Sequence, residues 1–391
     1  MNKTNSGLYT VHNRVQLIRG GAEYFNKMVE MIDSASSSIL LQVYIFDEDE
    51  TGNRIADALI NATTREVLVY LLVDGYASQR LPPSFIKKLE NSGIYFGYFE
   101  QVFRTRYFYI GRRMHTKVLV IDAAKSMVGG VNISNRYNDI NNIPAWMDWA
   151  IYAEGEIAEV LHRECVDMWN KSILRHRYAE VKTNWADHTV KEECLVRARK
   201  NDWVKRRTEI TKSYREMFRH ARSYITIMSG YFWPARRLLN KMAYASKRGV
   251  KIRLILASRS DISIAKHAER YMYRWLFRNN IEVYEYQGSV LHGKIAVYDD
   301  KWVTGGSYNV NNISAFASIE LNLDIKDAGF AKVVHEKLQN VIEKNCVQVT
   351  SANYESNYNL FQRFRQSLSY WVVHLIFRLF TFYFRQDKYK G

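Results

Sequence analysis

The sequence predicts an α/β protein made of two similar lobes, with an amphipathic helix at the C-terminus. Three observations predict this fold class: a motif that occurs twice, flanking segments that repeat with it, and alternating strand-like and helix-like segments. The motif H-x-K-x4-D-x6-G-[GS]-x-N begins at His115 and again, 177 residues later, at His292. A repeat of this kind defines the architecture of a chain, because each copy forms one structural unit.

The segments before each motif repeat as well. "SSSILLQVYIF" (36–46) resembles "RSYITIMSGYF" (222–232), and "REVLVYLLVDG" (65–75) resembles "GVKIRLILASR" (249–259). Apolar runs rich in Val, Ile and Leu are typical of strands buried on both faces between helices. Each half is therefore predicted to run strand, helix, strand, helix, strand, followed by the motif strand, which is an α/β arrangement.

The chain has 391 residues, which is enough for two domains of ordinary size. We expect the first lobe at 1–180 (motif 115–132) and the second at 204–350 (motif 292–309). The stretch 181–203 is polar and charged without a long apolar run, and it is predicted to be the linker. Residues 351–391 are expected to form the C-terminal amphipathic segment.

The chain is strongly basic, with a formal net charge of +16 at pH 7. Such a charge favours polyanionic partners, either nucleic acid or an anionic membrane surface. Composition alone does not choose between them.

Three scattered cysteines, Cys165, Cys194 and Cys346, show no C-x-x-C spacing. They predict neither a disulfide framework nor a zinc site, and they favour a reducing compartment. The N-terminus "MNKTNSGLYTVHN" lacks the apolar run of a signal peptide, so we expect a cytosolic origin.

The motif residues suit displacement at a phosphodiester. This reaction needs a nucleophile, an acid for the leaving oxygen, and donors around the charged non-bridging oxygens. Two histidines supply the first two, because histidine titrates near neutral pH. Lysines supply positive charge, and no metal or other cofactor is expected. Candidate donors to the phosphate are Lys117, Lys294, Asn132, Asn309, Ser307 and, through its backbone N–H, Gly130, which stands where the second motif has Ser307.

Asp122 and Asp299 complete the candidate catalytic set of His115, Lys117, Asp122, His292, Lys294 and Asp299. Both aspartates follow apolar runs at predicted strand ends. A structural role in a turn explains these positions nearly as well as a catalytic role does. We expect these two carboxylates to fix the geometry of the motif and not to take part in the chemistry.

The two segments resemble the paired HKD motifs of the phospholipase D superfamily, and the chain is similar to bacterial cardiolipin synthases. The resemblance includes "RRMHTKVLVID", "MDWAIYAEG", "LHGKIAVYDDKWVTGGSYN" and "SIELNLDI" and extends from about Val15 to Asp327. It implies one active site between the lobes and a phosphohistidine formed by one motif histidine, for which we favour His115. It also implies that Asp148 and Glu320 each hydrogen-bond the histidine of the opposite half.

The resemblance further implies transfer of a phosphatidyl group to phosphatidylglycerol, with phosphatidylglycerol or phosphatidylethanolamine as donor. The alternatives are a phospholipase D-type hydrolase, a phosphodiesterase acting on nucleic acid, and a non-catalytic membrane scaffold. We expect an anionic phospholipid membrane as partner and no nucleic acid, with the protein peripheral or monotopic on the cytoplasmic side of the cell membrane. The oligomeric state stays open.

Three segments are candidates for the membrane contact. Apolar residues recur every three or four positions between Leu360 and Arg385, which predicts an amphipathic interfacial helix. The alternative is a helix packed on the protein core. Basic and aromatic residues also alternate in 101–113 and 267–280, before each motif, and such stretches suit a lipid-facing lip or stacking on single-stranded nucleic acid.

Overall fold

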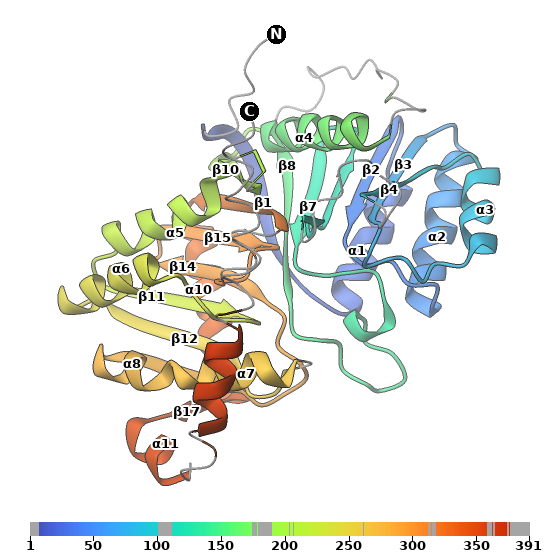
Figure 1. Ribbon diagram of the computed structural model, residues 1–391. Helices are drawn as coiled ribbons and strands as arrows, with labels where there is room; N and C mark the ends of the chain where they lie inside the picture. The colour runs from blue at the N-terminus through green and yellow to red at the C-terminus, as the bar shows by residue number, and fades with distance from the viewer. Residues whose placement is uncertain are drawn as a thin grey trace, which may run out of the picture.

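The computed structural model describes residues 8–100, 112–173, 178, 190–202, 204–205, 207–260, 262–311, 314, 318–357, 362, 364–373 and 375. Two α/β halves lie side by side, with α1, α2 and α3 on the outer side of one half and α5, α6 and α8 on that of the other (Figure 1). The predicted fold of two similar α/β lobes is confirmed.

The first half builds one sheet with the strand order β4-β3-β2-β6-β7-β8-β1. Strands β2, β3 and β4 are parallel, and the later pairs are antiparallel. Its elements are β1 (Thr10–Arg19), α1 (Ala22–Asp33), β2 (Ser38–Val43), α2 (Glu50–Thr63), β3 (Leu68–Asp74), α3 (Pro83–Asn91), β4 (Tyr95–Phe99), β5 (Arg113–Met114), β6 (Val118–Ile121), β7 (Lys125–Gly129), the 3-10 helix η1 (Asn135–Tyr137), β8 (Trp149–Gly155) and α4 (Glu156–Ser172).

The second half repeats this order as β13-β12-β11-β14-β15-β16-β9, with β17 added at the outer edge of β13. Its elements are β9 (Glu193–Asp202), β10 (Arg207–Thr208), α5 (Glu209–His220), β11 (Tyr224–Ser229), α6 (Arg236–Lys247), β12 (Lys251–Ala257), α7 (Ser263–Tyr271), α8 (Tyr273–Arg278), β13 (Ile281–Tyr286), β14 (Lys294–Tyr298), β15 (Trp302–Gly306), β16 (Ser318–Lys326), α10 (Ala328–Asn345), β17 (Cys346–Val349) and α11 (Ser351–Asn357).

The halves meet at β1 and β9, which pair antiparallel. A shared core underlies this junction: α4 and α10 bury residues such as Leu161 and Leu338 together with strand residues of both halves, among them Ile151 and Val303. Each half has a further core of its own beneath its outer helices. Burial of one continuous apolar cluster across the junction makes the two halves parts of one folded body.

The linker predicted at 181–203 is wrong in its second part, because residues 193–202 form β9, which pairs with β16 and β1. The apolar pattern does not predict this strand, because it carries charged side chains where buried strands usually carry apolar ones. Arg197 and Arg199 are buried, and both contact Asp324 of β16. A carboxylate on the neighbouring strand thus compensates charges that are costly to bury alone. Residues 181–189 lie outside the described residues.

Part of the predicted C-terminal helix is described, namely residues 362, 364–373 and 375, which are helical. The rest of Leu360–Arg385 lies outside the described residues, as do residues 101–111 of the segment 101–113. Among the helices that the structure describes, none has the length and apolar character needed to span a bilayer.

Candidate active site

The two motifs converge on one cavity of about 490 Å³, whose lining includes His115, His292, Asn132 and Asn309. His115 lies between β5 and β6, and His292 lies two residues before the start of β14. Asn132 and Asn309 follow β7 and β15, the partners of the motif strands. Each strand–turn–strand unit therefore brings the histidine and the asparagine of its motif to the same end of its sheet.

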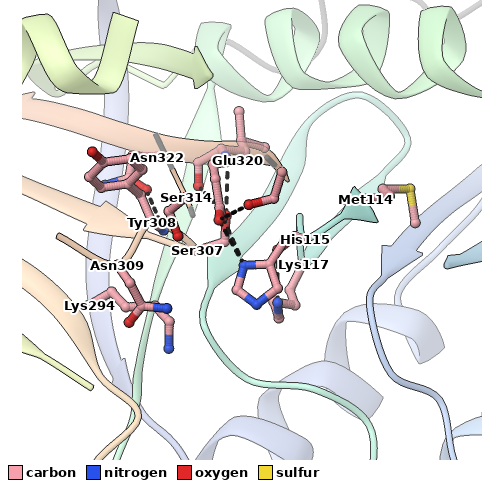
Figure 2. Close-up of polar contacts among 12 residues, drawn as sticks. Met114, His115, Lys117, Lys294, Ser307, Tyr308, Asn309, Ser314, Glu320 and Asn322 are labelled. Atoms are coloured by element: carbon pink, nitrogen blue, oxygen red, sulfur yellow. Dashed lines mark hydrogen bonds and ion pairs between the residues drawn. The ribbon is translucent and has the colours of Figure 1, made fainter. Parts of the chain in front are cut away.

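Each histidine contacts an acid from the opposite half. The Nδ1 atom of His115 lies 2.9 Å from Oε2 of Glu320, and the Nδ1 atom of His292 lies 2.6 Å from Oδ2 of Asp148. Figure 2 shows the His115 ring turned towards Glu320, with Lys117, Lys294 and Asn309 around the same space. The crossed pairing expected from the sequence is present in these contacts.

Backbone contacts between the halves produce this crossing. Strand β5 pairs with β16 through Arg113 and Met114, and the His115 N–H donates to the carbonyl of Ile319 at 3.0 Å. In the other half, the His292 N–H donates to the carbonyl of Met147 at 2.8 Å. Each histidine is therefore anchored to the residue that precedes its partner acid in the chain.

The two acids are held differently. Glu320 accepts hydrogen bonds from the hydroxyls of Ser307, at 2.5 Å, and Ser318, at 2.9 Å. Asp148 accepts the N–H of Trp149 at 2.8 Å and lies 4.0 Å from Nζ of Lys294. Both carboxylates are fully buried. The longer acid thus has two hydroxyl donors, while the shorter one depends on a backbone donor and a nearby lysine.

Electrostatics separate the two pairs further. Burial lowers the pKa of His115. Burial would raise the pKa of Glu320, but its interaction with His115, the nearby Lys117 and the Ser307 hydrogen bond outweigh burial and lower it. Burial raises the pKa of Asp148 to about 6, against the opposing charge of Lys294. At neutral pH these directions favour a neutral His115 beside an ionised Glu320. Asp148 therefore holds a proton more readily than Glu320 does.

Each motif lysine donates a hydrogen bond to the backbone carbonyl of the histidine in its own motif. Nζ of Lys117 donates to the carbonyl of His115 at 2.8 Å, and Nζ of Lys294 donates to the carbonyl of His292. Burial lowers the pKa of Lys117 to about 7, although Glu320 opposes the shift. An anion in the cavity would favour the charged lysine.

The two asparagines are fixed by their amide oxygens. Asn132 accepts the N–H of Ile45 at 3.2 Å, and Asn309 accepts the N–H of Tyr231 at 3.3 Å. Each side-chain oxygen therefore faces the backbone, and the NH₂ group is the donor that the residue can offer to a phosphate.

Ser307 and Gly130, expected to be phosphate donors, donate to protein groups in the structure. The Ser307 hydroxyl donates to Glu320, and the Gly130 N–H donates to the carbonyl of Trp149 at 3.3 Å. A Cβ atom at Gly130 would overlap both carboxylate oxygens of Asp148. The two positions therefore shape the pockets of the acids: a serine holds Glu320, and a glycine leaves room for Asp148.

Asp122 and Asp299 lie at the opposite end of the motif strands from the histidines. Asp122 accepts the backbone N–H groups of residues 36, 37 and 38 and two serine hydroxyls. Asp299 accepts three backbone N–H groups of residues 222–224. Neither contributes to the cavity lining. These contacts fit the expected structural role and not a catalytic one.

Sequence reasoning did not select the aromatic residues around the histidines. The ring centroid of Tyr44 lies 4.8 Å from that of His115, and Tyr137 and Trp146 lie 5.3 and 5.9 Å from His292. A signal for Tyr44 was present, because the repeated segments 36–46 and 222–232 align Tyr44 and Ile45 with Gly230 and Tyr231, and all four residues line the cavity. Of the charged lining residues, Arg113 and Glu269 belong to the segments 101–113 and 267–280 singled out in the sequence, whereas Arg136 and Lys266 were not selected.

Across the part of the chain that the structure describes, no group of three or more His, Cys, Asp or Glu side chains is arranged to hold a metal ion.

Comparison with known proteins identifies the family. A family model described as the PLD-like domain of cardiolipin synthase matches residues 28–169 and 214–342. The chain belongs to this family. The cardiolipin synthase B proteins of Salmonella typhimurium (strain LT2) and Escherichia coli (strain K12) are 34% and 33% identical to it over 346 and 347 residues, and each alignment covers 86% of this chain and 82% of the relative.

Solved structures support the fold independently. The phosphatidylserine synthase of Haemophilus influenzae matches with a TM-score of 0.72 at 15% identity, covering 96% of this chain and 97% of that one. A polyphosphate kinase of Porphyromonas gingivalis matches with a TM-score of 0.59 at 14% identity, covering 87% of this chain and 49% of that one. As a cardiolipin synthase family member with a phospholipase D-like fold, the chain is a phosphatidyltransferase of the phospholipase D type.

Proposed function

We propose that this family member makes cardiolipin by transferring a phosphatidyl group to phosphatidylglycerol through a phosphohistidine on His115. The observation that carries the proposal is the pair of crossed histidine–acid contacts at a single cavity. Two histidines with different acid partners are suited to different roles in one displacement at phosphorus.

In the first half of the reaction, Nε2 of His115 attacks phosphorus and the P–O bond to the donor headgroup breaks. His292 gives its Nε2 proton to the leaving alkoxide. Glu320 supports this role of His115, because an ionised carboxylate at Nδ1 fixes the tautomer with its lone pair on Nε2. The lowered pKa of His115, caused by burial, keeps the attacking nitrogen unprotonated.

In the second half, His292 takes the proton from a hydroxyl of phosphatidylglycerol. The hydroxyl oxygen attacks phosphorus, the P–N bond to His115 breaks, and both histidines return to their starting states. The lysines and the NH₂ groups of Asn132 and Asn309 would donate to the non-bridging oxygens, where negative charge develops.

The choice of lipid substrates rests on the relatives, which are named cardiolipin synthase B. Phosphatidylglycerol is proposed as acceptor, and phosphatidylglycerol or phosphatidylethanolamine as donor. The net charge of +16 supports binding of the protein to an anionic membrane surface. We propose a peripheral or monotopic position on the cytoplasmic side.

The deciding experiment follows the products formed by the pure protein on phosphatidylglycerol vesicles. We expect cardiolipin and glycerol in equal amounts, with and without EDTA. Phosphatidic acid without cardiolipin would identify a hydrolase, and cleavage of single-stranded DNA with neither lipid product would identify a nuclease.

A second experiment assigns the nucleophile. A phosphodiester with a p-nitrophenol leaving group needs little acid catalysis. His292→Ala should therefore still release a burst of p-nitrophenolate and retain the phosphoryl group covalently. His115→Ala should give no burst, and the reverse result would assign the nucleophile to His292.

A further inference from the structure

The helix at residues 364–375 presents its apolar side to solvent. Four large side chains at a spacing of four, three and four residues are between 51% and 65% exposed: Phe364, Leu368, Trp371 and Leu375. This spacing places them on one stripe of a helix. We call these four residues the apolar stripe.

The opposite side of the same helix faces the protein and includes polar residues. Gln366 and Ser369 are buried, and Oε1 of Gln366 accepts a hydrogen bond from the Tyr354 hydroxyl at 2.5 Å. The ring of Tyr370 stacks on Tyr271 of α7 with a centroid separation of 4.6 Å. Packing against the second lobe therefore fixes which side of the helix points outward, and that side is the apolar one.

The helix is also part of the wall of the active-site cavity. Val373 lines the cavity together with Ile262, Ile264 and Ala265 at the start of α7. Ile262 and Ile264 are themselves 49% and 41% exposed, so apolar surface continues from the cavity to the outside. In Figure 1 the red C-terminal helix lies beside α7, in agreement with the ring contacts between them.

Positive charge flanks this surface. Arg365, next to Phe364 in the helix, is exposed. Burial raises the pKa of Tyr370, and the charge of Arg236 opposes this rise. Burial lowers the pKa of His267 of α7, and the charge of Arg365 lowers it further. An apolar stripe bordered by arginines is typical of surfaces that enter the headgroup region of anionic membranes.

We propose that the apolar stripe and the exposed isoleucines of α7 form the surface by which the protein sits on an anionic bilayer, with the acyl chains of the reacting lipid leaving the cavity between α7 and the helix. This inference rests on the proposed function, because a phosphatidyl group held at the histidines needs an apolar path for its chains. A second copy of the chain is less suited than a bilayer to cover this surface, because two identical cationic surfaces repel each other.

The test compares two double variants of the full-length protein. Leu368→Ser with Trp371→Ser removes the centre of the stripe, and Val333→Ser with Tyr244→Ser removes two exposed apolar side chains on α10 and α6. All four side chains are at least 44% exposed, so both variants should fold. Each is assayed for sedimentation with phosphatidylglycerol–phosphatidylcholine vesicles, and for turnover of vesicle lipid and of monomeric short-chain phosphatidylglycerol.

We expect the stripe variant to bind vesicles at least tenfold more weakly and its ratio of vesicle turnover to short-chain turnover to fall by a similar factor. The control variant should match wild type. Unchanged vesicle binding by the stripe variant would overturn the proposal, and loss of a dimer on sedimentation velocity in that case would assign the stripe to a second copy. Failure of the proposed function looks different: wild type would turn over neither substrate while the difference in vesicle binding remained.

Discussion

His115 and His292 stand at equivalent positions of the repeat but have different acid partners. Glu320 has two hydroxyl donors and a lowered pKa, whereas burial raises the pKa of Asp148 to about 6. A duplicated site becomes useful for a two-step displacement when its copies differ, because nucleophile and acid need different protonation states.

Replacing either histidine should abolish transfer. We expect His115→Ala and His292→Ala each to lower turnover on phosphatidylglycerol at least about a thousandfold, because neither can take over the other's role. His12→Ala, at an exposed position of β1, is the matched control and should retain full activity. A tenth of wild-type turnover in either site variant would exclude the two-histidine mechanism.

The acids predict opposite dependences of stability on pH. Asp148 has a folded-state pKa of about 6 against an ordinary 3.8, so its stabilising contribution is complete below about pH 4 and lost as pH rises through 6. The stability of Asp148→Asn relative to wild type should therefore increase between pH 4.5 and pH 8, by up to about 2 kcal/mol. The measurement is the free energy of unfolding in urea at both pH values.

Glu320→Gln is the counterpart, because the folded-state pKa of Glu320 is lowered. Its contribution is present above the ordinary pKa and lost as pH falls through the lower folded-state value. This variant should lose stability at neutral pH and less at acid pH. The same trend in both variants would contradict the asymmetry between the two pairs.

The residues behind the acids provide a third test. Gly130→Ala places a Cβ against the Asp148 carboxylate, which must move away from His292. We expect turnover to fall about a hundredfold with little change in KM, as for a catalytic group displaced by about 1 Å. Ser307→Ala leaves Glu320 bonded to Ser318 and His115, and it should cost less than about tenfold. Equal effects of the two substitutions would refute this account.

At the scale of elements, a carboxylate at the far end of each motif strand ties that strand to the start of its neighbour. Asp122 has a φ of 50° and holds residues 36–38, which lead into β2, through five hydrogen bonds. Asp299 has a φ of 51° and holds the start of β11 in the same way. The aspartate of each motif thus fixes the register of the strand that follows the histidine.

Asp122→Asn should therefore affect stability and not chemistry. Asparagine tolerates the positive φ but lacks the charge that accepts these hydrogen bonds, so the free energy of unfolding should fall by about 2–3 kcal/mol. Turnover per folded molecule at low temperature should stay within about threefold of wild type. Urea denaturation and steady-state assays on the same preparation measure both quantities. Loss of turnover at unchanged stability would return Asp122 to the catalytic set.

At the scale of the whole molecule, the shared core and the β1–β9 pairing predict that the two lobes unfold together. Leu161 of α4 and Leu338 of α10 belong to one buried cluster, so opening one lobe exposes apolar surface of the other. Calorimetry should show one transition whose calorimetric and van 't Hoff enthalpies agree. Two separable transitions would mean that the junction contributes little to the cooperative unfolding of the two lobes.

The sequence by itself determined the duplication, the α/β class and the two histidine–lysine pairs, because these follow from local spacing and from the apolar runs of buried strands. The crossed acids came from the family resemblance, since no spacing rule joins His115 to Glu320, which lies 205 residues away. Only the tertiary structure decided that 193–202 is a strand, because its arginines are compensated by Asp324 on a neighbouring strand. It also decided that Ser307 donates to Glu320 and that Gly130 leaves room for Asp148. The structure likewise shows that the described part of the C-terminal helix exposes its apolar side. In each of these cases the function of a side chain depends on a partner that chain folding brings to it.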